Sequence, residues 1–191
     1  DGQMFVFTSK LFMGNSPSGK PFFQEDLYFS ELDKFKKWRG AKNFNAPINT
    51  RRNNEGASSI SHDGKYLFFT ACGLQGGFGS CDLYVTQFEG GKWLPPSNMG
   101  PQINTGAWES HPSLSPNGRT LYFASSRRGG AGGTDIWQSE KKSNGTWGIP
   151  TPVSFNTSLP RAVFVNKVNV FDCLFGLPAV LNLANISADS P

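Results

Sequence analysis

Three aspartates stand at equivalent places in the chain and are the first candidates for chemistry. Asp26, Asp82 and Asp135 each precede an apolar pair, which is Leu-Tyr in the first two cases and Ile-Trp in the third. A carboxylate at the start of a strand can serve as an acid, a base or a metal ligand, and it can also accept hydrogen bonds from loop N–H groups. Because a ligand site needs asymmetry while a repeated unit needs uniformity, the threefold recurrence favours the structural role.

Two glutamates and two histidines are the remaining candidates for acid–base or metal chemistry. Glu55 and Glu109 also recur at equivalent positions, which favours hydrogen bonding within their own repeats. His62 and His111 stand alone, without a cysteine or a second histidine at the spacing of metal ligands. We therefore predict no catalytic residue, no metal and no cofactor, and we expect that the chain is not an enzyme.

Five residues do not recur in this way, and they are the candidates for binding. We expect them at one end of the sheets, where the loops that join strands two and three meet the connections between repeats. Arginines beside a tryptophan can hold a peptide terminus, a sugar or an anionic group. The alternative is that the arginines bridge neighbouring repeats. The candidates are Arg51, Arg52, Trp108, Arg127 and Arg128.

The cysteines indicate a redox setting. Cys72 and Cys81 flank the loop GLQGGFGS, at the facing ends of two predicted strands. Antiparallel neighbours joined by a loop can bring their Cβ atoms within disulfide range, so we predict a Cys72–Cys81 bridge and an oxidising, extracytoplasmic setting. Two buried free thiols are the alternative. Cys173 is left without a partner in this chain, so it is either buried or available for an intermolecular bond.

The elements that must position these residues come from a unit that occurs three times. The segments 1–7, 63–69 and 117–123 each begin with Asp-Gly or Asn-Gly and continue as an apolar run, which indicates a turn followed by a strand. The aspartates follow, and then Trp38, Trp93 and Trp147, which we expect to pack between units. The period of about 54 residues is typical of propeller blades, and no segment has the apolar stripe of a helical solenoid.

We therefore predict an all-β fold, a β-propeller of four-stranded antiparallel blades with three blades visible. Within residues 1–157, blade one covers 1–50 and lacks its inner strand, blade two covers 51–105, and blade three covers 106–157. In blade one, strands are expected over 4–9 and 26–32, with a long loop between them. The segment 158–191 departs from the repeat and is either an unrelated extension or a closing strand.

Three blades are too few for the usual closed ring of about four to eight. We expect either part of a longer propeller or two chains that complete a six-bladed ring. The net charge of +4 is small and the basic residues are scattered, so nucleic-acid binding is not predicted. There is no clean apolar run of about eighteen residues, so no membrane span is expected either.

The strings SPNGRTLYFASSRRGGAGGTDIW and SHDGKYLFFTACGLQGGFGSCDLYV resemble the WD40-like (TolB-type, PD40) propeller repeats of bacterial periplasmic and outer-membrane proteins. The cysteine pair, the Trp-x-x-Pro spacing and the closing Ile-Asn-Thr are similar to one subgroup, the OmpA-family peptidoglycan-associated lipoproteins of Bacteroidetes-type bacteria. Some of these serve type IX secretion and gliding. The resemblance covers about residues 1–157 and implies a periplasmic or outer-membrane-associated location. Peptidoglycan binding would belong to the OmpA-like domain of that family, and not to these repeats.

The resemblance favours a non-enzymatic module of the cell envelope that binds or scaffolds other proteins, as part of a secretion or peptidoglycan-associated complex. The expected partners are envelope proteins, together with a second copy of the chain if a ring is completed. A glycan-binding or glycan-hydrolysing propeller is one alternative, and a self-assembling structural protein is another.

Overall fold

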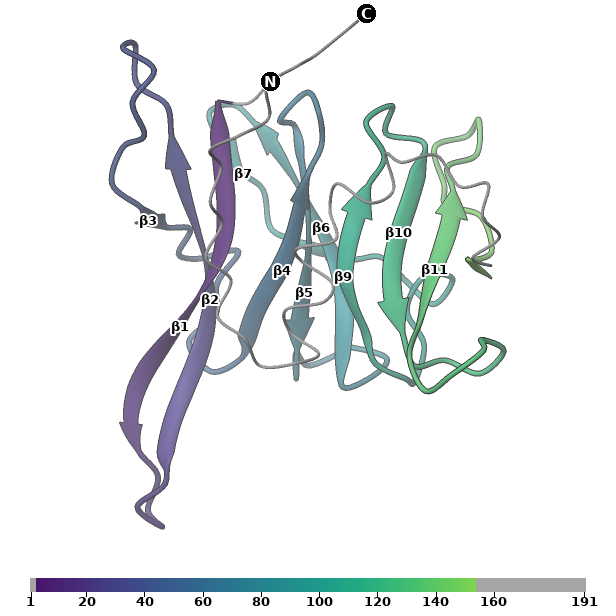
Figure 1. Cartoon of the computed structure of the whole chain (residues 1–191), viewed down its shortest axis with the longest axis horizontal. Helices are drawn as coiled ribbons and strands as arrows, with labels where there is room; N and C mark the ends of the chain where they lie inside the picture. The colour runs from purple at the N-terminus through teal and green to yellow at the C-terminus, as the bar shows by residue number, and fades with distance from the viewer. Residues whose placement is uncertain (1–2, 154–191) are drawn as a thin grey trace, which may run out of the picture. The chain divides into compact units, whose positions relative to one another are not determined.

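The computed structural model describes residues 3–153, which form β-strands and no helix (Figure 1). These strands belong to the first of two compact units of the chain, Asp1–Phe155. The predicted fold class is confirmed, because the described residues are all-β and make antiparallel sheets consistent with part of a propeller. The strands are β1 (Met4–Asn15), β2 (Pro21–Glu31), β3 (Lys42–Asn43), β4 (Asn54–Ile60), β5 (Tyr66–Cys72), β6 (Cys81–Glu89), β7 (Lys92–Trp93), β8 (Ser97–Asn98), β9 (Glu109–Leu114), β10 (Thr120–Ser125), β11 (Asp135–Glu140) and β12 (Thr151–Pro152).

Each of the three sheets is a meander in chain order. The first sheet has the order β1-β2-β3, and the third has the order β9-β10-β11-β12. The second sheet runs β4-β5-β6, and both β7 and β8 pair with β6. The last strands of every sheet contain only two residues, so the backbone ladder ends early at that edge.

Local sequence explains the tight turns. Gly64 and Gly118 have φ values of +70° and +69°, which only glycine adopts without strain. Their N–H groups donate to the carbonyl oxygens of Ser61 and Ser115, in each case at 2.8 Å. The same Asp-Gly or Asn-Gly signal therefore closes the hairpin between the first two strands of the second and third sheets.

The hairpin of the first sheet is longer than predicted. β1 and β2 pair from Met4 opposite Glu31 to Asn15 opposite Pro21, with one irregularity between Phe12 and Gly14. The expected long loop between residues 9 and 26 was therefore wrong. The segments 10–13 and 21–24 are rich in β-favouring residues, and a turn in which the Gly19 N–H donates to the Ser16 oxygen at 2.8 Å brings them together.

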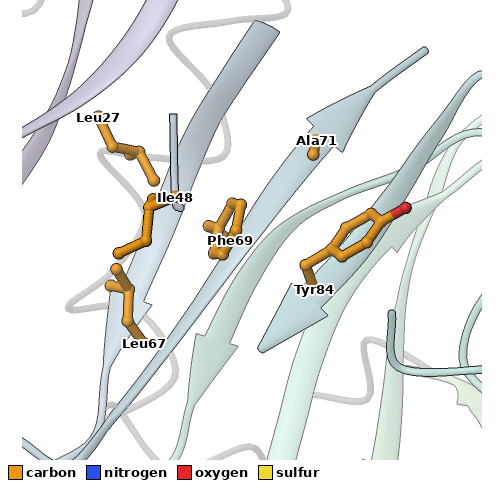
Figure 2. Packing of buried hydrophobic residues seen from close by; sticks show 6 residues of the cluster. All are labelled: Leu27, Ile48, Leu67, Phe69, Ala71 and Tyr84. Carbon is orange, nitrogen blue, oxygen red and sulfur yellow. The ribbon is translucent and has the colours of Figure 1, made fainter. Parts of the chain in front are cut away.

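The core consists of two apolar clusters that lie between sheets, and strand β5 contributes side chains to both clusters. Alternate residues of β5, namely Leu67, Phe69 and Ala71, pack with Leu27 and Ile48 of the first repeat (Figure 2). Phe68, which lies between Leu67 and Phe69 in the strand, points to the other side of the sheet and packs with Leu121 and Phe123 of the third sheet. The two-residue period of a strand thus gives the second sheet two apolar faces.

The blade limits and the tail remain predictions. The segment 158–191, its proposed closing strand and Cys173 lie outside the described residues. Within residues 3–153, no helix is long and apolar enough to cross a membrane.

Candidate functional site

The candidate site is the end of the sheets where β4 and β9 begin and where β5 and β10 end. Four of the five predicted binding residues are accessible there: Arg51, Arg52 and Arg128 are exposed, and Trp108 is half-buried. We call these four residues the loop face. The fifth candidate, Arg127, is mostly buried, with 11% of its side chain accessible.

Arg127 serves the interior of the protein. Its guanidinium lies 3.3 Å from the carboxylate of Glu109, which is fully buried. It stacks on the rings of Phe123 and Trp137, at 4.9 and 5.1 Å from their centroids. It also donates to the backbone oxygen of Ile103, in the connection that precedes β9. The structure therefore places Arg127 as an internal cation that joins the second and third repeats, beneath the exposed Arg128.

The carboxylate of Glu109 organises the start of β9. It accepts hydrogen bonds from the Thr105 N–H at 2.8 Å, from the Thr105 hydroxyl at 2.7 Å and from the Ser125 hydroxyl at 2.8 Å. These bonds fix the connection between the second and third sheets to the strands on either side of it. The loop face therefore rests on a hydrogen-bonded frame.

Glu55 occupies the same place at the start of β4 but has a different environment. Thr50 again donates to its carboxylate, through the N–H at 3.0 Å and the hydroxyl at 2.8 Å. In the ladder, Glu55 faces Ala71, whereas Glu109 faces Ser125 in the next repeat. The position equivalent to Arg127 is held by Gly73. Burial raises the pKa of Glu55 from 4.5 to about 7, and the neighbouring Asp26 contributes in the same direction.

The three aspartates occupy matching ladder positions. Asp26 faces Ser9, Asp82 faces Ala71 and Asp135 faces Ser125. Each carboxylate accepts hydrogen bonds from its own repeat. For Asp82 the donors are the N–H groups of Phe78 and Gly79 and the side chain of Asn98; for Asp26 they are Gln24 and Asn43; for Asp135 the donor is the N–H of Gly132.

Sequence reasoning missed the asparagines that complete this frame. Asn104 accepts from the Leu83 N–H at 2.8 Å and donates to the Leu83 oxygen at 2.9 Å, and Asn49 makes the same pair of bonds with Leu27. These residues form the recurring Asn-Thr pairs in the sequence, so their repetition was visible. Their function, which is to bond to the backbone of Leu27 and Leu83 next to the residues paired by the two-residue strands β3 and β8, was not visible, because it depends on contacts about 21 residues away.

The three recurring tryptophans differ in exposure, although the backbone of each makes an antiparallel pair with a residue of its own repeat. Trp93 contacts Phe44 of the first repeat at 6.0 Å, and Trp147 contacts Phe68 of the second sheet at 6.1 Å. Trp38 is 52% exposed and lies against Phe5 of its own sheet at 6.2 Å. The first two therefore lie between sheets, whereas Trp38 lies on an open sheet face.

The predicted disulfide is present. Cys72 ends β5 and Cys81 begins β6, and the two residues stand directly opposite each other in the ladder. The bridge closes the glycine-rich loop 73–80, which packs tightly on the next repeat. An ideal Cβ at Gly79 would overlap the carbonyl oxygen of Ala107, so only glycine fits there. The backbone of Trp108 pairs with that of Cys81 through a parallel bridge, so the connection that carries Trp108 is joined to the start of β6.

His111, which the sequence offered as a lone histidine without a metal-ligand partner, is buried. It has a φ of 55°, only 6% of the residue is exposed, and neither ring nitrogen has a hydrogen-bond partner among the residues that the structure describes. The centroid of its ring lies 5.8 Å from that of the Trp108 ring, and the backbone N–H of His111 donates to the hydroxyl of Thr70 at 3.2 Å. Ala57 holds the same place in β4, where its N–H donates to Thr8. The strained backbone is thus a repeated feature, but the imidazole occurs once.

The fold defines the class of protein: the described part of the chain is all-β, and its antiparallel sheets are consistent with part of a β-propeller. No family model matches the chain, and comparison with curated proteins gives no match. The resemblance to a particular lipoprotein subgroup remains a prediction.

Three similar solved structures can be reported. The first is a structure assigned as TolB from Agrobacterium tumefaciens, with 19% identity, a TM-score of 0.40, and coverage of 82% of this chain and 47% of the other. The second is a puromycin-hydrolyzing peptidase from Mycobacterium tuberculosis, with 13% identity, a TM-score of 0.48, and coverage of 82% and 22%. The third is the periplasmic gluconolactonase PpgL of Pseudomonas aeruginosa, with 15% identity, a TM-score of 0.35, and coverage of 78% and 39%.

The chain spans less than half the length of each of these structures, and the similarity concerns the fold. Two of the three carry the names of enzymes, which contradicts the prediction that the chain is not an enzyme. The physical reason is that a propeller is a scaffold whose loops can carry catalytic as well as binding groups. Absence of a recognisable catalytic motif in the sequence was not a sufficient ground for that prediction.

Proposed function

We propose that the chain is a protein-binding propeller module of the bacterial cell envelope, and that its partner docks on the loop face. The observation that carries the proposal is the contrast between exposed and buried arginines. Arg51, Arg52 and Arg128 are exposed, whereas Arg127 neutralises Glu109 in the interior. The exposed cations therefore have no comparable role inside the fold.

The chemistry of the loop face indicates the chemistry of the partner. Arginine binds carboxylates through two parallel hydrogen bonds, and the half-buried indole of Trp108 offers an apolar surface beside them. Aromatic residues and arginine are also the side chains that dominate binding energy in protein interfaces. A segment with carboxylates next to an apolar residue fits this arrangement.

The disulfide supports an extracytoplasmic location for the proposed function. Disulfide bonds persist in the periplasm and at cell surfaces, and they are rare in the reducing cytosol. The Cys72–Cys81 bridge holds the loop 73–80 next to Trp108, so an oxidising compartment would also preserve the loop face. A place in a secretion or peptidoglycan-associated complex would be consistent with this location.

The test is a comparison of two triple variants in capture from a native envelope extract. The first variant, Arg51→Ser/Arg52→Ser/Arg128→Ser, removes the exposed cations of the loop face. The control, Lys34→Ser/Lys92→Ser/Lys142→Ser, removes three exposed cations from the turns at the opposite end of the sheets. A captured protein is then purified and its affinity for each variant is measured.

We expect the loop-face variant to bind the purified partner at least about tenfold more weakly, and the control to bind normally. Equal affinity of both variants for every purified partner would contradict docking on the loop face. Melting curves of both variants show whether the substitutions leave the fold intact, as expected for exposed side chains.

A second candidate function, self-assembly, is favoured by the open face of the first sheet. Trp38, Phe5, Phe7 and Tyr28 form a continuous row of ring contacts, at 6.2, 5.6 and 5.9 Å. Three of them correspond in register to Phe69, Tyr84 and Trp93, which pack on the preceding sheet in the interior. Another blade of the same kind, in this chain or in a second copy, is the surface that fits the row.

Measurement of mass in solution tests this second candidate. We expect a dimer that the double variant Phe5→Ser/Trp38→Ser dissociates, because two exposed aromatic side chains would leave the contact. A monomer at micromolar concentration, with the aromatic row intact, would contradict self-assembly through a second copy.

A further inference from the structure

The hairpin of β1 and β2 ends in a two-stranded ribbon that no other strand of residues 3–153 pairs with. It extends beyond the loops of the second and third sheets (Figure 1). Its base is anchored, because the side chain of Gln24 donates to the Thr50 oxygen at 2.6 Å and the Glu25 N–H donates to Asn54 at 3.0 Å. Among the described strands, residues 10–23 pair only across the hairpin, since β3 reaches no further than Tyr28 and Phe29. We call residues 10–23 the hairpin tip.

The hairpin tip exposes large apolar side chains on both of its faces. Phe12 and Phe23 stand opposite each other, so they share one face, and their rings meet at 5.7 Å. Phe22 is next to Phe23 in the strand and therefore belongs to the other face. The exposed fractions are 61% for Phe12, 52% for Met13, 51% for Phe22 and 41% for Phe23. No single flat surface could cover all of these side chains at once.

The charge of the hairpin tip is of one sign. Lys10 and Lys20 are exposed, and residues 3–24 contain no aspartate or glutamate. The first carboxylates, Glu25 and Asp26, lie at the anchored base, and Asp26 is buried. The Lys10 ammonium lies 5.1 Å from the ring centroid of Phe23, so the cation and the apolar tip are adjacent.

We propose that the hairpin tip inserts into the surface of a membrane that contains anionic phospholipids. Insertion surrounds a narrow ribbon, so it would bury apolar side chains on both faces together. Lys10 lies behind Phe12 and Phe23 on the ribbon, and Lys20 lies beyond them in the turn 16–20. At the membrane surface, both long side chains would reach the level of the headgroups and bind lipid phosphates. The proposal concerns residues outside the loop face, so it does not depend on the proposed function.

A protein groove is the competing occupant, and the two-sided exposure argues against it. A groove would have to enclose the ribbon from both sides and also provide carboxylates for Lys10 on β1 and for Lys20 in the turn. A bilayer interface offers both features without any specific fit, because its acyl chains and phosphates adapt to the inserted side chains. Charge complementarity therefore favours the anionic lipid surface.

The test is flotation of the full chain with vesicles of defined composition. Vesicles of phosphatidylethanolamine with phosphatidylglycerol are compared with vesicles of phosphatidylcholine alone. We expect binding to the anionic vesicles and little binding to the neutral ones. Phe12→Ser/Phe22→Ser/Phe23→Ser should reduce binding at least about tenfold, and each of Lys10→Gln and Lys20→Gln should reduce it about fivefold.

Matched controls remove the same chemistry elsewhere on the surface. Phe35→Ser and Ile149→Ser delete side chains that are 70% and 80% exposed, and Lys92→Gln deletes an exposed cation. These variants should bind anionic vesicles like the unmodified chain. Equal melting temperatures of the tip variants and the unmodified chain confirm that a loss of binding is not a loss of folding.

Two results would overturn the proposal. The first is no flotation of the unmodified chain with anionic vesicles at any accessible lipid concentration. The second is flotation that the triple phenylalanine variant retains in full. If the tip variants lose a protein partner while neither they nor the unmodified chain bind vesicles, the hairpin tip is a protein-docking element and the lipid assignment is wrong.

Discussion

At the scale of the residue, two buried glutamates at equivalent positions differ in how their charge is balanced. Glu109 has Arg127 at 3.3 Å and a hydroxyl donor in Ser125, whereas Glu55 faces Ala71 and Gly73. A buried carboxylate is costly unless it is paired, and a buried cation that loses its partner is costly as well. The same change at the two positions should therefore have different effects.

We predict that Glu109→Gln lowers the free energy of unfolding by about 3 kcal/mol, because Arg127 would remain buried without a counter-charge. Glu55→Gln should change it by less than about 1 kcal/mol at neutral pH, since the amide keeps the size of the side chain and carries no charge. Denaturation in urea at pH 7.5 measures both. Equal losses for the two variants would contradict the assignment of Arg127 as the partner of Glu109.

The raised pKa of Glu55 makes a prediction about pH. In the unfolded chain the group titrates near 4.5, and in the folded protein burial raises its pKa to about 7. The folded state therefore binds this proton more tightly, and the contribution of Glu55 to stability decreases as pH rises from about 4.5 to about 7. The difference in unfolding free energy between the unmodified chain and Glu55→Gln should follow that window. A difference that is constant with pH would contradict it.

His111 should act in the opposite direction. Burial lowers the pKa of its imidazole below the ordinary 6.5, and within residues 3–153 neither ring nitrogen finds a hydrogen-bond partner. The unfolded state then binds the proton more tightly, so stability is retained above pH 6.5 and lost as pH falls below it. We predict that His111→Phe removes this acid sensitivity and has little effect at pH 8. Unfolding curves of the two proteins between pH 4 and 8 measure it, and unchanged acid sensitivity in the variant would refute the prediction.

At the scale of the element, the loop 73–80 joins covalent and hydrogen-bonded restraints. The disulfide fixes both ends of the loop, and Asp82 accepts two of its N–H groups, at 2.7 and 3.0 Å. The loop also packs on the connection that carries Trp108. The order of the loop face should therefore depend on this element as well as on the arginines themselves.

We predict that Cys72→Ser/Cys81→Ser lowers the free energy of unfolding by about 2–3 kcal/mol, because the bridge closes a short loop and restricts the unfolded chain. The hydrogen bonds of Asp82 should keep the folded loop in place. Denaturation with and without reductant measures the loss. Reductant should lower the stability of the unmodified chain by the same amount as the double substitution, and it should not change the stability of the variant. Full stability of the double variant would contradict this role of the bridge.

At the scale of the whole molecule, the described sheets are coupled through their nearest neighbours. The second sheet packs on the first through one apolar cluster and on the third through another. The first sheet has one of its faces open, with Phe5 41% and Trp38 52% exposed. In repeat proteins, stability is approximately the sum of each unit and its interfaces, so the second sheet should be the most stable of the three.

Hydrogen exchange gives the measurement for this prediction. We expect the amides of β5 and β6 to exchange most slowly, and those of β1 beyond Ser9 to exchange fastest among the strands, because the hairpin tip has a single layer. Faster amide exchange in β5 than in β1 would contradict the proposed coupling between neighbouring sheets. A variant such as Leu67→Ala, which opens the first of the two clusters, should cost about 2–5 kcal/mol and speed exchange in the first sheet.

The sequence by itself determined the repeated unit, its strands and turns, the matching aspartates and the disulfide. These features are local: alternation along a strand, glycine in a turn, and two cysteines on adjacent strands joined by a short loop. They need no knowledge of which surfaces meet. The order of strands and loops along the chain is also a local feature, so the sequence predicted at which end of the sheets the non-repeated residues would lie.

Only the tertiary structure decided which of those residues are free. Arg127 and Arg128 are neighbours in the chain, yet the first neutralises a buried carboxylate and the second faces solvent. Arg127 lies two residues after Ser125, which faces Glu109 in the ladder, so its side chain reaches the carboxylate. His111 is buried by contacts with a separate strand, and the loop predicted after residue 9 pairs with itself as a ribbon. Burial, charge balance and exposure are properties of surfaces that meet, so they follow from packing.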